Sequence, residues 1–340
     1  MGRRILNGLA SLLLGGAVAL GSVSNNTQRA FDGPEKPEQI AYVAETNKED
    51  WDIYVRDLKG AHPPIKLVDS DRMDLDPCLS GDGKRLYFSS DRDGEKFNIY
   101  LMNLGGVPKD PNEPSTVKLT EGIDNFRFPS PSPDGKRIAF SLDRGSNWDI
   151  YVMPAEGMGD DGDGLVRVTD GKGMDLRPRW LNNGKLVFIS NEGRGLMGFD
   201  IYFKNADGTG DAIRITDGVG SNNYLSLSPL GDRIAFASNR EGRIKETKAN
   251  RVTQGRIKEV VINEKRLYDI FSIGLDGKGL LNLTGGIWNN RFPFWSGNGD
   301  EIYFTSDRDG EDALYSVRED GKGEVKKVFD GLIYSPTCSH

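Results

Sequence analysis

Hydrophobic and polar positions alternate in short runs along most of this chain, and the same pattern returns about every fifty residues. In one copy Ser132-Pro-Asp-Gly-Lys-Arg-Ile-Ala-Phe-Ser141 is followed, after a short polar loop, by Asp149-Ile-Tyr-Val-Met153. Alternation with a period of two is typical of strands that pack one face against a core. A core aromatic residue marks six copies, at Tyr42, Phe88, Phe140, Phe188, Phe236 and Phe304.

Each copy predicts four strands. The first is short, as in Phe292-Pro-Phe-Trp-Ser296, the second contains the marker aromatic, and the third is Asp-Ile-Tyr-like. The fourth alternates apolar and polar residues, as in Val166-Arg-Val-Thr169. One such unit cannot bury its own faces and must stack on its neighbours. Six units therefore predict an all-β fold, a six-bladed β-propeller with four-stranded antiparallel blades.

The first copy begins at its second strand, Ile40-Ala-Tyr-Val43, without a proline-containing strand before it. The missing strand matches the C-terminus, because Ser335-Pro-Thr-Cys-Ser339 resembles Asp76-Pro-Cys-Leu-Ser80. We therefore expect residues 38–340 to form the propeller, closed by the C-terminal strand joining blade one. Cys78 and Cys338 then lie on neighbouring inner strands, which predicts a disulfide, or two free thiols if they point into separate cores.

The N-terminus has a different pattern. Arg3 and Arg4 precede an apolar run that ends at Leu20, and small residues follow it. This arrangement predicts a secretory signal peptide over residues 1–24, with an uncleaved membrane anchor as the alternative. Residues 25–37 read as a flexible leader. After cleavage we expect no membrane span and an extracytoplasmic location, whether periplasmic, secreted or on the cell surface.

Composition narrows the possible functions. The net charge of −7 gives no electrostatic support for nucleic-acid binding. Two histidines and the lack of a Gly-x-Ser-x-Gly motif argue against His-rich metal sites and hydrolase chemistry. We predict no catalytic residues, no cofactor and a monomer. Asp160, Asp161 and Asp163 form a weak candidate calcium site, with a solvated acidic turn as the alternative.

Binding residues are expected where otherwise repeated units differ. The segments leading into the innermost strands vary, and we expect them to bring a polar set to the channel mouth: Asp74, Arg127, Asp175, Arg177, Asn222, Asn290 and Arg291. Loops between second and third strands on the same face add Asp91, Asp93, Asp307 and Asp309. The alternatives are a solvated channel and local turn chemistry with ion pairing.

An insertion over residues 243–266 in blade five breaks the repeat. It holds eight Lys or Arg residues and three Glu residues, and its alternation predicts a protruding β-hairpin. A basic arm on an acidic body is suited to contact a protein partner, an acidic lipid surface or a glycan. The alternative is a solvated arm without a partner.

The repeated sequence from Ser132, the Asp-Ile-Tyr-Val from Asp149 and the Arg-Val-Thr from Arg167 resemble the WD40-like repeats of TolB-type propellers. The resemblance covers residues 38–340. It implies a periplasmic protein whose propeller binds partner proteins at the channel mouth. The family carries a separate α/β domain before its propeller, which residues 25–37 cannot hold, so we expect a stand-alone relative.

The sequence therefore predicts an exported, non-catalytic propeller that binds a protein or peptide on its channel-mouth face. One alternative is a carbohydrate-active or hydrolytic enzyme with a site in the central channel. Another is a structural or cell-surface module.

Overall fold

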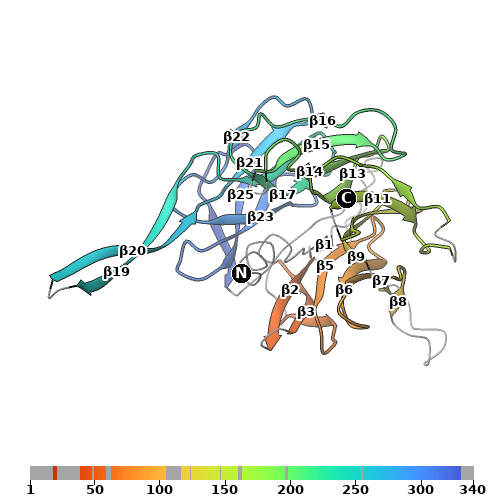
Figure 1. The fold of residues 1–340 in the computed structure, drawn as a ribbon, viewed down its shortest axis with the longest axis horizontal. Coiled ribbons are helices and arrows are strands. Elements are labelled where there is room, and N and C mark those ends of the chain that lie inside the picture. The colour runs from red at the N-terminus through yellow and green to blue at the C-terminus, as the bar shows by residue number, and fades with distance from the viewer. Residues whose placement is uncertain are drawn as a thin grey trace, which may run out of the picture.

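Six four-stranded antiparallel sheets surround a common axis in the computed structural model, as the repeat predicts (Figure 1). The structure describes residues 18–20, 39–47, 50–58, 63–104, 116–122, 124–145, 147–159, 163–195, 198–253 and 256–330. Within these residues the chain forms strands and turns, and the all-β fold class is confirmed. They include no helix long and apolar enough to cross a membrane.

The strands of each blade are hydrogen-bonded in chain order. Blade one contains β1 (Val18–Leu20), β2 (Gln39–Asn47), β3 (Asp50–Asp57) and β4 (Ile65–Val68). Blade two contains β5 (Asp74–Leu79), β6 (Arg85–Ser90), β7 (Asn98–Asn103) and β8 (Thr116–Lys118). Blade three contains β9 (Asn125–Pro131), β10 (Arg137–Asp143), β11 (Trp148–Pro154) and β12 (Val166–Arg167).

The remaining blades follow the same plan. Blade four contains β13 (Asp175–Trp180), β14 (Lys185–Ser190), β15 (Asp200–Asn205) and β16 (Ile213–Arg214). Blade five contains β17 (Asn222–Leu227), β18 (Arg233–Ser238), β21 (Asp269–Gly274) and β22 (Leu281–Asn282). Blade six contains β23 (Asn290–Trp295), β24 (Glu301–Ser306), β25 (Ala313–Arg318) and β26 (Lys326–Asp330).

The marker aromatic of each second strand stacks on an aromatic residue directly opposite it in the third strand. Ring centroids of Phe88 and Tyr100 are 5.7 Å apart, and those of Phe140 and Tyr151 are 6.2 Å apart. The same pair occurs in the other four blades. Cross-strand aromatic pairs contribute about 0.5–1.5 kcal/mol beyond their buried area. The repeat seen in the sequence is therefore a repeated packing unit.

The innermost strands contact one another around the axis, and β1 contacts both β5 and β23, so the ring is closed. Val18–Leu20 pairs with the inner edge of β2. This strand comes from the segment expected to be a signal peptide, where the sequence predicts closure by the C-terminus instead. The predicted closing strand, residues 335–339, lies outside the described residues, and its role stays a prediction.

The predicted hairpin in blade five is confirmed. β19 (Ile244–Thr253) pairs with β20 (Arg256–Arg266) and projects away from the propeller (Figure 1). Because it connects β18 to β21, the second and third strands, it leaves the propeller on the channel-mouth face. We call this two-stranded sheet the arm.

The core lies between neighbouring blades. Trp180 and Trp295 are buried in interblade clusters. Cys78 is buried, and burial raises the pKa of its thiol to about 11. Its Sγ lies 3.9 Å from the carbonyl oxygen of Leu79. Cys338 lies outside the described residues, so the pairing stays a prediction.

Candidate functional site on the channel-mouth face

A polar cluster joins neighbouring blades beneath the channel-mouth face. At the junction of blades four and five, Asp200 Oδ1 accepts hydrogen bonds from Thr216 Oγ1 at 2.7 Å and Asn222 Nδ2 at 3.0 Å. Thr216 Oγ1 in turn accepts the amide of Ile201 at 3.0 Å. Asp269, Thr284 and Asn290 repeat this arrangement between blades five and six. The Asp-Ile-Tyr and Arg-Val-Thr motifs therefore fasten one blade to the next.

Four predicted binding residues belong to this interblade cluster or its equivalent. Asp74, Asp175, Asn222 and Asn290 open the inner strands and are at most 4% exposed. Asp74 pairs with Arg92 at 2.8 Å. Burial raises the pKa of Asp175 to about 6, against the opposing effect of hydrogen bonds from Ser190 and Thr169. Their intramolecular partners give these side chains a role in holding blades together.

Two residues further along each inner strand, the backbone breaks its regular pattern. One residue in each of blades two to six has a positive φ, between 52° and 58°: Asp76, Phe128, Arg177, Tyr224 and Phe292. The pairing register with the second strand shifts at the same place in all five blades. A β-bulge inserts an extra residue and redirects a side chain. The left-handed conformation costs a non-glycine residue about 1–3 kcal/mol, so the surrounding fold must enforce it.

These five residues contact one another in blade order and form what we call the axial cluster, together with Arg127 and Arg291. The Arg177 guanidinium lies 4.2 Å from the ring centroid of Phe128 and 5.0 Å from that of Tyr224. The rings of Tyr224 and Phe292 meet edge to face at 4.2 Å. Burial lowers the pKa of Arg177 to about 10. The cluster links blades across the axis with cations and aromatic rings.

The cations of the axial cluster have carboxylate partners. Arg127 Nε lies 2.5 Å from Asp76 Oδ2, and Arg291 Nη2 lies 2.6 Å from Asp312 Oδ2. The sequence pattern predicts Arg127, Arg177 and Arg291 near the channel mouth, but it does not predict Asp76 and the three aromatic residues there. The sequence does contain a signal for these residues, because each of Asp76, Phe128, Arg177 and Phe292 precedes the proline of its first strand and the residue type differs between blades. Only the bulge in the structure shows that this residue turns toward the axis.

The four aspartates predicted in the top loops make local contacts. Asp91 Oδ1 accepts the amide of Met73 at 2.9 Å, and Asp307 Oδ1 accepts that of Asn289 at 2.8 Å. Each bond ties a loop to the segment leading into its inner strand. Asp93 accepts Tyr100 Oη at 2.7 Å, and Asp309 pairs with Lys327 at 3.0 Å. These bonds are the turn chemistry and ion pairing that the sequence left as the alternative.

Apolar side chains are exposed on the rim of the channel-mouth face. The loops from the fourth strands to the next inner strands carry Val219, 47% exposed, and Ile287, 65% exposed. Both stand three residues after the threonine of the interblade cluster, in adjacent blades. Lys172 occupies the same position one blade earlier and is exposed. The rim therefore presents apolar residues on one side and a cation on the other.

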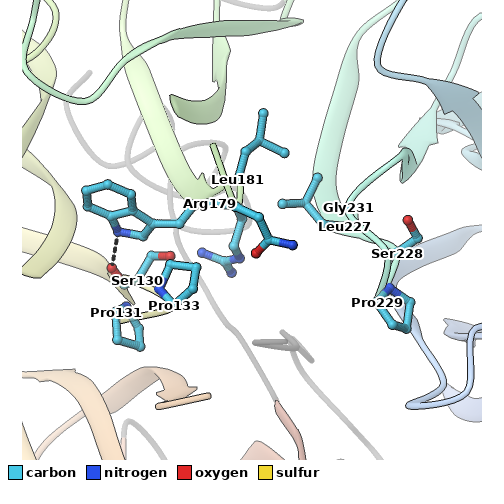
Figure 2. A pocket seen from close by; sticks show the side chains of 11 residues that line it. Ser130, Pro131, Pro133, Arg179, Leu181, Leu227, Ser228, Pro229 and Gly231 are labelled. Carbon is cyan, nitrogen blue, oxygen red and sulfur yellow. Dashed lines mark hydrogen bonds between the residues drawn. The ribbon is translucent and has the colours of Figure 1, made fainter. Parts of the chain in front are cut away.

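The opposite face has a small cavity of about 40 Å³ between blades three, four and five. Figure 2 shows Arg179 between Ser130 and Pro133 on one side and Leu227 and Pro229 on the other. Trp180 Nε1 donates to the Ser130 carbonyl at 2.9 Å. The cavity has room for about one water molecule. In the weak calcium candidate, Asp160 and Asp161 lie outside the described residues.

Comparisons with known proteins agree with this geometry. No family model matches the chain. An uncharacterised protein of Agrobacterium fabrum is 27% identical over 67% of this chain and 68% of its own length. A TolB homologue of Chlorobium luteolum is 31% identical over 47% of this chain, a match that spans only 33% of that protein. The crystal structure of TolB from Acinetobacter baumannii superposes with a TM-score of 0.62 at 21% identity, covering 88% of this chain and 66% of that one.

Proposed function

We propose that this propeller, which is similar to TolB proteins, is an exported, non-catalytic protein that binds a protein or peptide partner on its channel-mouth face. The observation that carries this proposal is the pair of exposed apolar residues on the rim, Val219 and Ile287. Protein interfaces centre on apolar anchors that polar residues surround. The rim of the channel-mouth face offers such anchors beside charged loops and the base of the arm.

Three further observations support this proposal. The axial cluster varies from blade to blade, while the surrounding scaffold repeats, and variation of this kind is expected of a recognition surface. The two carboxylates beside the described axial cluster, Asp76 and Asp312, are each paired with an arginine, whereas glycoside hydrolysis uses a pair of carboxyl groups that flank the substrate. The apolar run after Arg3 and Arg4 supports export.

Partner capture with matched surface variants tests the proposal. The full chain is used as bait in an envelope fraction, and Ile287→Asp is compared with Leu230→Asp. Leu230 is 78% exposed in a turn on the opposite face and is the matched control. Both substitutions fall on exposed loops and should change the unfolding free energy by less than about 0.5 kcal/mol. We expect Ile287→Asp to lose the captured protein and Leu230→Asp to keep it; the reverse pattern would place the binding face on the other side.

A further inference from the structure

Blade three has a groove on the channel-mouth face. The groove encloses about 490 Å³ and is lined by Arg144, Asn147, Asp149, Tyr151, Arg167, Gly171 and Lys172. This volume is in the range of ligand sites. Three of its lining side chains are cations and one is a carboxylate. Asp149 is already paired, because its Oδ2 lies 2.7 Å from Arg167 Nη2.

In three other blades the loop arginine is held by a serine at the end of the second strand. In blade two, Arg92 donates to Ser90 Oγ at 3.0 Å and to Asp74 at 2.8 Å, and its guanidinium covers the Phe88 and Tyr100 rings. Arg240 in blade five and Arg308 in blade six make the same contacts with Ser238 and Ser306. The arginine in these blades belongs to the packing of the blade.

Blade three replaces the serine by Leu142, which is 1% exposed and offers no hydrogen-bond acceptor on its side chain. Arg144 stands where Arg92 stands in blade two, but its side chain is 55% exposed, compared with 19% for Arg92. Among the described residues its carboxylate partner is Asp124, at 3.8 Å. Asp143 also differs, since it accepts the amide of Gly145 in its own loop instead of the segment leading into the inner strand. Arg144 keeps its contact with the Tyr151 ring, 5.1 Å from its guanidinium, but Leu142 cannot offer it the hydrogen bond that Ser90 offers Arg92.

We propose that this groove binds an acidic peptide segment of the partner, whose carboxylates pair with Arg144 and Lys172; this inference rests on the proposed function. Arginine and carboxylate form directional, charge-assisted pairs. The groove lies on the same face as Val219 and Ile287, and Lys172 occupies the rim position that those residues hold in later blades. Because Asp149 lines the groove, a singly charged carboxylate meets less repulsion there than a phosphate dianion does.

Binding of a labelled hexaglutamate peptide to the full chain tests the groove, with hexaglutamine as the neutral comparison. We expect salt-sensitive binding of hexaglutamate that is at least about fivefold weaker in Arg144→Gln and in Lys172→Gln. Lys278→Gln is the matched control, because Lys278 is 84% exposed in a turn on the opposite face. Equal affinity of the groove variants and the wild type overturns the proposal, as does equal binding of hexaglutamine. Displacement of the peptide by an equal concentration of inorganic phosphate overturns the choice of a carboxylate ligand.

A second variant tests whether Leu142 is the reason that Arg144 is exposed, and it keeps every charge of the groove. Leu142→Ser restores the serine of blades two, five and six, so Arg144 should donate a hydrogen bond to it and hexaglutamate binding should weaken. Thermal unfolding shows whether this variant folds; if it does not, Arg144→Gln decides. Unchanged binding in a folded Leu142→Ser protein contradicts the explanation. If Ile287→Asp abolishes capture while the groove variants bind hexaglutamate as the wild type does, the proposed function stands and the groove assignment is wrong. If Ile287→Asp captures the partner normally while the groove variants lose hexaglutamate, the groove assignment stands and the proposed binding face is wrong.

Discussion

The two faces of the propeller are built from the same repeats, yet one is uniform and the other is not. On the face opposite the channel mouth, the turn after the inner strand has the same chemistry in four blades. In one of them Ser132 Oγ bonds Asp134 at 2.5 Å and accepts the amide of Arg137 at 2.9 Å. Ser80, Ser228 and Ser296 repeat this pattern.

The channel-mouth face varies at equivalent positions. Its rim carries a cation at Lys172 and apolar side chains at Val219 and Ile287. The loop arginine is packed in three blades but exposed in blade three. In blade five the corresponding loop is extended into the arm. Beneath this variable surface, the interblade cluster is again regular. Repetition therefore marks the residues that hold the fold, and departure from it marks the surface available for recognition.

The largest effect on stability is expected from a substitution in the interblade cluster beneath the channel-mouth face. Asp200→Ala leaves Thr216, Asn222 and Arg194 without their shared acceptor in a buried site. Loss of one partner from such a network costs about 3–5 kcal/mol. Chemical denaturation should show this loss in the free energy of unfolding, while Asp211→Ala, at an exposed position in the preceding loop, should match the wild type. A loss below about 1 kcal/mol would mean that the cluster does not hold the blades.

A second test uses the pH dependence of the same layer. The carboxyl of Asp175 titrates near 4 in the unfolded chain and at about 6 in the folded protein. The folded state therefore binds more protons between these values, and this residue lowers stability as pH rises through the window. Asp175→Asn, which copies Asn222 and Asn290, should raise the unfolding free energy at pH 7 by about 1–3 kcal/mol.

At pH 4 the benefit of Asp175→Asn should vanish, because the wild-type side chain is then protonated in the folded state. Denaturation curves at the two pH values provide the measurement. A benefit of equal size at both values would show that burial of the charge is not its cause.

The uniform face should respond more weakly and without any effect on binding. Ser132→Ala removes the hydroxyl that bridges Asp134 and the Arg137 amide. Net hydrogen-bond contributions suggest a loss of about 1–2 kcal/mol in unfolding free energy. Capture of the partner should be unchanged, in contrast to Ile287→Asp. Loss of capture in a folded Ser132→Ala protein would contradict the assignment of the two faces.

The smallest effect on stability is expected from the arm. Arg243 pairs with the buried Asp269 and should be kept, so the replacement by a short Gly-Ser link is best confined to residues 246–264. Changing the length of a surface loop costs little. Thermal unfolding should shift by only a few degrees, while partner capture weakens if the basic arm takes part in recognition. A fall of more than about 10 °C would make the arm part of the folding core.

The candidate site could be predicted only in part. Polar residues at the starts of the inner strands were identified from sequence, but Asp74, Asp175, Asn222 and Asn290 turn into interblade contacts. The residues two positions later form the axial cluster. Sequence alternation assigns faces by a period of two, and a bulge shifts that assignment by one residue. On each of these strands the residue before the bulge therefore holds blades together, and the residue at the bulge joins the axial cluster.

The sequence by itself determined the propeller, because period-two alternation, a repeated aromatic pair and repeated turns are local signals that six copies reinforce. It also located the arm and the variable loops. Only the tertiary structure shows which of the repeated polar residues are engaged in contacts within and between blades. Ser90 accepts a hydrogen bond from Arg92, whereas Leu142, at the same position in blade three, offers Arg144 no acceptor. The sequence shows the substitution, but only the folded blade shows that this position lies within hydrogen-bond distance of the loop arginine.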